Sequence, residues 1–124
     1  MLLENKYYQL IRVDDSGSPS EKTYQLALMP DCNVYRGHFP GNPVCPGVCN
    51  IETIKECAMM LTGKKLIIST IKQCRLTAIA TPKVCPEISV HVSATETDQG
   101  YSIVASIFDM KQTYMEYKGE MMIL

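Results

Sequence analysis

The segment "RGHFPGNPVCPGV", residues 36–48, places three prolines and three glycines around one histidine, His38. Proline fixes φ and removes an N–H donor, whereas glycine permits backbone angles and close approaches that other residues resist. A loop of this composition holds one shape and presents His38 rigidly, as a catalytic loop must. A lone histidine more often has a structural role, so the neighbouring residues are needed to distinguish a catalytic His38 from a structural one.

The residues that follow this segment predict one helix, from Gly47 to about Gly63. Pro46 stands where a proline is tolerated at a helix start, and Gly63 stands at a stop position. An apolar stripe recurs at spacings of three and four residues: Val48, Ile51, Ile54, Ala58 and Leu61. Further apolar residues, among them Met59 and Met60, extend around most of the circumference. We therefore expect other structure to wrap this helix.

The rest of the chain has the alternating pattern of β-strands. Residues 6–14 and 22–29, on either side of the turn cluster "DSGSP", predict a hairpin, and strands are expected at 65–77, 87–97, 101–110 and 113–124. The strand at 87–97 alternates most cleanly, with one apolar face made of Ile88, Val90, Val92 and Ala94. The order predicts a single α+β domain over residues 1–124, an antiparallel sheet wrapped around one central helix. An edge strand of this sheet could pair with a second copy.

Composition excludes several classes of function. The chain has 124 residues, of which 46% are hydrophobic and 20% charged, enough for an ordinary core. The net charge is −1 and lysines and arginines do not cluster, so we expect no nucleic-acid partner. No apolar run approaches the roughly 18 residues of a membrane span. The N-terminal "MLLENKYYQL" becomes charged at Glu4 and Lys6, unlike a signal peptide, and a cytoplasmic protein is expected.

Six cysteines are present: Cys32, Cys45, Cys49, Cys57, Cys74 and Cys85. They include no C-x-x-C pair, and the two histidines, His38 and His91, lie far apart in the sequence. Zinc ligation needs close pairs or histidines at ligand spacing. We therefore expect reduced, mostly buried thiols, with neither a metal nor a cofactor.

Two further residues, Glu52 and Gly47, favour a catalytic role for His38 over a purely structural one. Glu52 lies in the apolar stretch "VCNIETI", where a carboxylate is costly to ionise, so its pKa should be raised. The alternative is that Glu52 faces solvent. Gly47 stands at the predicted helix start, where backbone N–H groups are free and carry partial positive charge. A glycine there lets a carbonyl oxygen approach, which makes an oxyanion-hole-like donor.

The run "GHFPGNPVCPGVCNIE" resembles the active-site pattern of the 3-hydroxyacyl-[acyl-carrier-protein] dehydratases of the FabZ type. That pattern has a glycine nine residues and a glutamate fourteen residues after its histidine, and here these are Gly47 and Glu52. The order of elements resembles the hot-dog fold of that family over nearly the whole chain. The resemblance implies elimination of water from a 3-hydroxyacyl thioester to give a trans-2-enoyl thioester, in fatty-acid or related lipid or polyketide-like biosynthesis.

By this resemblance His38 is the base, Glu52 is the acid, and the Gly47 N–H binds the thioester carbonyl. The family shares each acyl tunnel between two subunits, so a homodimer or higher homo-oligomer is implied, with acyl carrier protein as the partner that delivers substrate. Expected substrate-binding residues around the tunnel are Phe39, Val44, Cys45 and Val48, together with Met59, although each packs equally well in a core.

The chain also departs from the dehydratase pattern. After the glutamate the family usually has "AMAQ", whereas here "TIKE" replaces its glutamine by Glu56, one turn beyond Glu52. Two carboxylates at that spacing disfavour joint ionisation, which would help keep Glu52 protonated or would disturb the site. We expect Glu56 to belong to the substrate-binding set. Lys55 is unusual on a helix that should be buried, although its charged end can snorkel to solvent.

The segment "CRLTAIATPKVCPEIS" keeps Arg75 and Pro86 but lacks the family's P-G-D ending. His91, on the polar side of its strand, is interpreted as an exposed histidine without a role. Two alternatives remain open beside the dehydratase. One is a thioesterase on the same fold, and the other is a non-catalytic subunit that binds acyl carrier protein.

Overall fold

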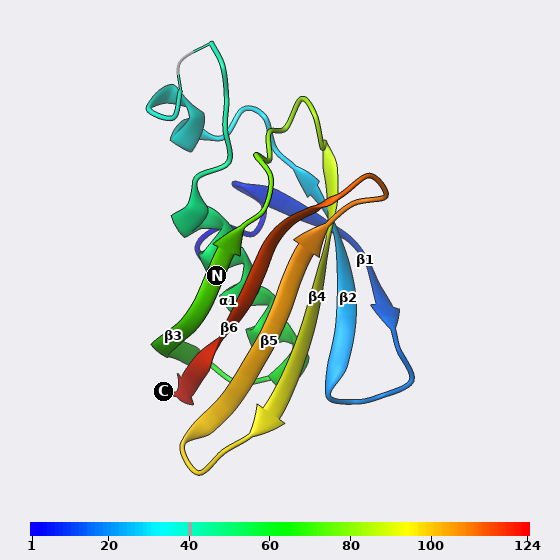
Figure 1. Ribbon diagram of the computed structural model, residues 1–124, viewed down its shortest axis with the longest axis vertical. Coiled ribbons are helices and arrows are strands. Elements are labelled where there is room, and N and C mark those ends of the chain that lie inside the picture. Colours follow the sequence, from blue (N-terminus) through cyan, green and yellow to red (C-terminus); the bar gives the residue numbers. More distant parts are fainter. Residues whose placement is uncertain (40) are drawn as a thin grey trace.

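Six antiparallel strands form one sheet in the computed structural model, which describes residues 1–39 and 41–124 (Figure 1). In chain order the elements are β1 (Tyr8–Asp15), β2 (Glu21–Leu28), the 3₁₀ helix η1 (Asn33–Arg36), α1 (Gly47–Thr62), β3 (Leu66–Leu76), β4 (Glu87–Glu96), β5 (Gly100–Phe108) and β6 (Thr113–Ile123). Every expected strand and the expected helix are present, with ends within a few residues of those predicted.

The strands are ordered β1-β2-β4-β5-β6-β3 across the sheet, so β1 and β3 form its two edges. The alternation in β4 sets which face is buried: Ile88, Val90, Val92 and Ala94 are all shielded from solvent, as predicted. β2 and β5 pair with β4 on its two sides and place their own buried residues on the same face. The helix packs against this shared apolar face of the sheet.

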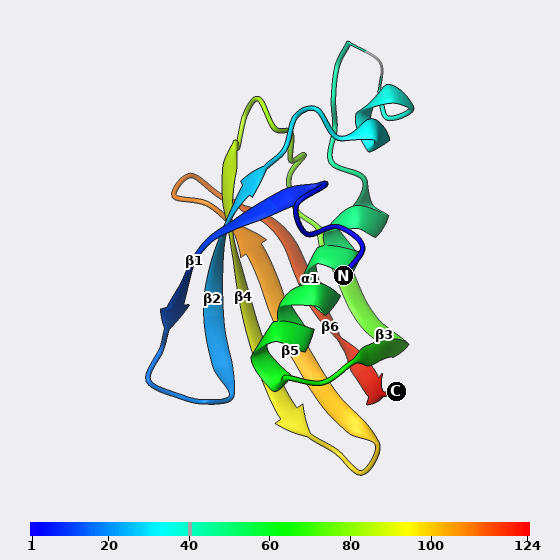
Figure 2. The ribbon, with the colours of Figure 1, turned by 180° about the vertical axis from the view of Figure 1, so that it is seen from behind.

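The helix α1 crosses that face, as the view from behind shows (Figure 2). It begins at Gly47, directly after Pro46, and ends before Gly63, whose φ of 70° is the left-handed conformation that a glycine adopts without steric cost. The Gly63 N–H donates to the Met59 carbonyl at 2.9 Å and so closes the last turn. Both ends of the helix are therefore set by the residues that predicted them.

The apolar stripe on α1 is only partly buried, and this corrects the prediction of a wholly wrapped helix. Ile54 and Ala58 are inaccessible to solvent, but Val48 leaves 75% of its surface exposed. The buried side also carries polar residues and reads Asn50, Thr53, Ile54, Glu56, Cys57 and Ala58. A helix that is apolar nearly all round has no single apolar face, so the periodicity did not indicate which side would meet the sheet.

One helix on the buried face of a curved antiparallel sheet is the hot-dog fold, as expected. β3 is an edge strand, bonded to β6 on one side and to no other strand among residues 1–39 and 41–124. Its side chains Ile67, Ile71 and Leu76 are largely exposed. None of the helices in the described part of the chain is long and apolar enough to cross a membrane.

Candidate active site

The loop before α1 holds His38 through bonds to Val44. The Val44 N–H donates to the His38 carbonyl at 3.0 Å, and the imidazole Nδ1 lies 3.3 Å from the Val44 carbonyl oxygen. A carbonyl oxygen only accepts, so Nδ1 carries the hydrogen of this contact, and the neutral ring keeps its lone pair on Nε2. The Phe39 ring stacks on the imidazole with centroids 4.3 Å apart. This contact holds the ring in place and leaves Nε2 as the ring nitrogen with a free lone pair.

The turn after His38 depends on Gly41, whose φ of 74° lies in the left-handed region that glycine favours. The Asn42 N–H donates to the Phe39 carbonyl at 2.9 Å across this turn. Pro40, one of the prolines expected to stiffen the loop, lies outside the described residues. At the far end of the loop, the Cys45 N–H donates to the Ala80 carbonyl at 2.8 Å. The loop is thereby bound to the segment that follows β3.

A pocket of about 520 Å³ lies between this loop, the start of α1 and the segment after β3. Its walls are His38, Val44, Cys45, Gly47, Asn50 and residues 76–80. Four of the residues predicted from the sequence therefore meet around one cavity, in which an imidazole faces a helix start. The remaining wall, residues 76–80, belongs to the segment in which the chain departs from the dehydratase pattern.

The first N–H groups of α1 are available at this pocket. The N–H groups of Cys49 and Asn50 both bond to the Pro46 carbonyl at 3.1 Å. Those of Gly47 and Val48 make no hydrogen bond with residues 1–39 or 41–124. Unpaired N–H groups at the start of a 16-residue helix carry partial positive charge, which suits a carbonyl oxygen that gains negative charge during a reaction.

Asn50 is a pocket residue that the sequence prediction missed. It is only 3% exposed, and its Oδ1 accepts a hydrogen bond of 3.0 Å from the Tyr7 hydroxyl. An asparagine inside an apolar helix stretch was the available signal, because a buried amide needs a partner. The neighbouring Tyr35 hydroxyl lies 3.5 Å from the Cys45 sulfur. Burial raises the pKa of the Cys45 thiol and so favours its neutral, less reactive form, and Cys45 is one of the walls of the pocket.

Glu52 lies on the opposite side of α1 from Asn50. Two residues along a helix correspond to a rotation of about 160° by the shorter way round. The Glu52 side chain is 24% exposed, and its carboxylate lies 3.6 Å from the Lys55 ammonium. Burial raises its pKa, Lys55 acts in the opposite direction, and the carboxyl group of Glu56 raises it further. The raised pKa agrees with the sequence-based expectation, but Glu52 does not line the pocket of its own His38.

Two other expected tunnel residues lie on the same side of the helix as Glu52. Val48 and Met59 lie within about 40° of it in helical rotation. Met59 is half-buried, and Phe39 on the loop is 51% exposed. The sequence-predicted residues thus form two groups in one chain. His38, Val44, Cys45 and Gly47 line the pocket, whereas Val48, Glu52 and Met59 lie on another side of α1, where Val48 is exposed and Met59 packs against the core.

Two expectations are not supported by these contacts. Glu56, expected at the substrate, has no exposed surface, and its oxygens accept hydrogen bonds from the segment that precedes and begins β1. His91 is half-buried instead of exposed, and its Nδ1 lies 2.9 Å from the Thr23 hydroxyl on the neighbouring strand. Residues that face each other in β2 and β4 make this contact, and alternation within one strand does not reveal it.

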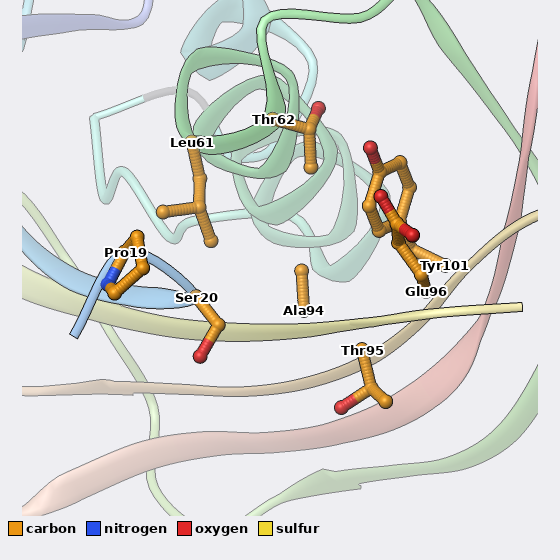
Figure 3. Close-up of a pocket in the computed structure, with 8 residues that line it drawn as sticks. All are labelled: Pro19, Ser20, Leu61, Thr62, Ala94, Thr95, Glu96 and Tyr101. Atoms are coloured by element: carbon orange, nitrogen blue, oxygen red, sulfur yellow. The ribbon is translucent and has the colours of Figure 1, made fainter.

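A second pocket, of about 470 Å³, lies at the other end of α1 (Figure 3). Leu61 and Thr62 at the end of the helix meet residues of the hairpin and of β4 and β5 there: Pro19, Ser20, Ala94, Thr95, Glu96 and Tyr101. None of the residues predicted to act in catalysis lines it. No group of three histidine, cysteine or acidic side chains that could hold a metal occurs among residues 1–39 and 41–124.

Comparison with known proteins identifies the family of the chain. The family model described as ApeI-like, ApeI dehydratase, matches residues 14–115. Two similar curated proteins are 3-hydroxyacyl-[acyl-carrier-protein] dehydratases FabZ. The one from Levilactobacillus brevis is 31% identical over 65% of this chain, and the match spans 61% of that enzyme's length. The one from Lactiplantibacillus plantarum is 28% identical over 80% of this chain and 74% of the enzyme.

Solved structures show the same fold. The dehydratase heterocomplex ApeI:P from Xenorhabdus doucetiae contains a chain that superposes with a TM-score of 0.73 at 22% identity, over 92% of this chain and 96% of that one. A protein from Helicobacter felis superposes with a TM-score of 0.67 at 16% identity, over 97% and 80% of the two chains.

Proposed function

This chain belongs to the ApeI-like family of dehydratases, and from that premise we propose that it converts a 3-hydroxyacyl thioester into a trans-2-enoyl thioester and water. The observation that carries the proposal is the pocket that both His38 and Gly47 line, where the Gly47 N–H at the start of α1 makes no hydrogen bond with residues 1–39 or 41–124. An elimination next to a thioester needs a base for the α-proton and a donor for the carbonyl oxygen that becomes negative.

In the proposed reaction, Nε2 of His38 removes the α-proton, and the electron pair of that C–H bond moves toward the thioester carbonyl. The Gly47 N–H stabilises the negative charge on the carbonyl oxygen. The C–O bond at carbon 3 then breaks as the protonated Glu52 gives its proton to the departing hydroxyl, which leaves as water. The enoyl double bond forms between carbons 2 and 3, and the raised pKa of Glu52 favours the protonated form that this step requires.

We also propose that a second subunit completes each site. In one chain Glu52 faces away from the pocket of its own His38, together with Val48 and Met59. The partner pairs along the β3 edge and brings its own Glu52 to that pocket, while the exposed β3 residues Ile67 and Ile71 become buried. A homodimer is the simplest arrangement. The solved relative is a heterocomplex, so a related dehydratase chain is the alternative partner. The molar mass of the purified protein in solution distinguishes the two.

We further propose that the substrate arrives on acyl carrier protein, in fatty-acid or related polyketide-like biosynthesis. This rests on the similarity to enzymes named for that substrate. The six thiols suit a reducing compartment such as the cytoplasm, where we place the reaction.

The test is a direct assay with 3-hydroxyacyl and enoyl thioesters on acyl carrier protein, followed by the absorbance of the enoyl group. We expect turnover in both directions and a loss of at least about 100-fold in His38→Ala. The matched control is His91→Ala, which changes the other histidine and should keep its activity. No turnover at any chain length would exclude the dehydratase and favour the non-catalytic carrier-binding subunit. Release of free acid from the thioester would favour the thioesterase.

A further inference from the structure

Glu56 is a fully buried carboxyl group that the proposed reaction does not use. It lies in the middle of α1, and the segment formed by residues 3–8 covers it. The Leu3 N–H donates to Oε2 at 2.9 Å, while the Glu4 N–H at 3.1 Å and the Tyr8 hydroxyl at 2.8 Å donate to Oε1. Three donors point at the two oxygens, which is the environment of an ionised, acceptor-only carboxylate.

Glu52 lies one helical turn before Glu56. Side chains four residues apart on a helix are neighbours, with Cβ atoms roughly 5–6 Å apart. The nearest cation is Lys55, whose ammonium lies 3.6 Å from a Glu52 oxygen. The other titratable groups around Glu52 and Glu56 are Cys49 and Cys57 on the helix and Glu4 and Tyr8 on the covering segment. These four groups are neutral or negative at neutral pH, so they add no positive charge at Glu56.

We propose that Glu56 is a positioning residue: residues 3–8 hold its carboxylate as a fixed anion, and this anion keeps the proton on Glu52. Two carboxyl groups one turn apart do not readily ionise together, and the three donors stabilise the charge on Glu56. Glu52, which has the more exposed carboxyl group, therefore carries the proton that an acid must give. Only one part of this inference rests on the proposed function, namely that the proton on Glu52 is given to the departing hydroxyl.

The raised pKa of Glu52 supports this assignment, because the carboxyl group of Glu56 contributes to it after burial. The identity of the residue matters as well. The dehydratase pattern usually has glutamine at the position of Glu56, and glutamine can accept a hydrogen bond but carries no charge. A glutamine would also turn an N–H₂ group toward one of the backbone N–H donors.

The test is the titration of Glu52 in the full-length protein, followed by NMR of ¹³C-labelled glutamate carboxyl groups, with Glu52→Gln used for assignment. In Glu56→Gln we expect the Glu52 midpoint to fall by about one pH unit, because a neighbouring negative charge is lost. An acid must be protonated, so the high-pH limb of the dehydratase rate should move to lower pH by the same amount. The matched control, Glu116→Gln, removes one negative charge from an exposed position on β6 and should leave the midpoint unchanged.

A Glu52 midpoint that stays in place in a folded Glu56→Gln protein overturns the inference, because a merely structural Glu56 would not move it. If Glu56→Gln does not fold, Tyr8→Phe serves instead. That variant removes one donor from the anion, lets the proton move partly to Glu56, and should lower the Glu52 midpoint by a smaller amount. The titration needs no turnover. A shifted midpoint in an inactive protein supports the role of Glu56 and refutes the proposed reaction, whereas an unshifted midpoint in an active protein refutes only the role of Glu56.

Discussion

Mixing two inactive variants, His38→Ala and Glu52→Gln, tests whether one site is built from two chains. Each variant alone lacks a group that the elimination needs, so each should be nearly inactive. The structure places Glu52 about 160° around α1 from Asn50, which lines the pocket of His38 in the same chain. If the acid comes from a second chain, a mixed dimer has one site with both changes and one site with neither.

The expected recovery follows from counting sites. When equal amounts of the two variants exchange subunits at random, about half of the dimers are mixed, and each has one intact site of two. The mixture should therefore regain about a quarter of the wild-type rate. If His38 and Glu52 served one site within a chain, every site would still lack one group, and mixing would recover nothing.

The assay follows enoyl absorbance after the variants are unfolded together in urea and refolded. His91→Ala mixed with Glu52→Gln is the control for recovery of folded, active enzyme after the urea step. His91→Ala chains keep both groups, so their own dimers retain two intact sites and the mixed dimers one, which gives about half of the wild-type rate. Exchange itself is verified by giving the two variants different affinity tags and recovering both tags in one purified dimer. Verified exchange, with a control near one half and a test mixture no more active than the unmixed variants, would refute a shared site.

Two further predictions concern stability and are tested by urea or thermal unfolding. A Cβ at Gly100 would collide with the Met121 carbonyl oxygen, so Gly100→Ala should lower the free energy of unfolding by about 3 kcal/mol. Gly63→Ala has open space around its Cβ and only a positive φ to accommodate, so it should lower the free energy of unfolding by about 1 kcal/mol. Equal losses in the two variants would contradict the contact at Gly100. Folding raises the pKa of Glu52, so the folded protein binds this proton more tightly than the unfolded chain does. The stabilisation that results is complete below the unfolded-state pKa of about 4.3 and is lost as the pH rises through the higher folded-state pKa. Between pH 4 and 7 the melting temperature of the wild type should therefore fall more than that of Glu52→Gln, and parallel curves would contradict it.

The fold could be predicted from the sequence because the strand patterns, the helix pattern and the residues at the helix ends all indicate the same arrangement. Strand alternation identified the buried face of β4, and Pro46 and Gly63 marked the ends of α1. The site loop was accessible for the same reason, since the spacing of His38, Gly47 and the prolines is a local property. Each of these predictions depends on residues close together in the chain.

What the sequence could not show were contacts between distant residues. Asn50 bonds Tyr7 across 43 positions, and Glu56 bonds the amide of Leu3 across 53 positions. Glu56 was expected at the substrate because it follows Glu52 by one turn, but its burial depends on a segment near the start of the sequence. The pairing of His91 with Thr23 likewise depends on the register between two strands.

These distant contacts also explain why α1 takes one rotation on the sheet. A helix with apolar side chains nearly all round could bury several alternative faces at similar cost. Tyr7 and Tyr8 remove that freedom, because their hydroxyls bond Asn50 and Glu56 respectively. Turning the helix by one residue would leave two buried polar groups without partners, at a cost of about 1–3 kcal/mol each. The rotation that satisfies Asn50 and Glu56 also places Glu52 away from the pocket of His38. The tyrosine pair therefore fixes the side of α1 on which Glu52 lies, and in the proposed mechanism a second subunit would have to bring the acid to the pocket of His38.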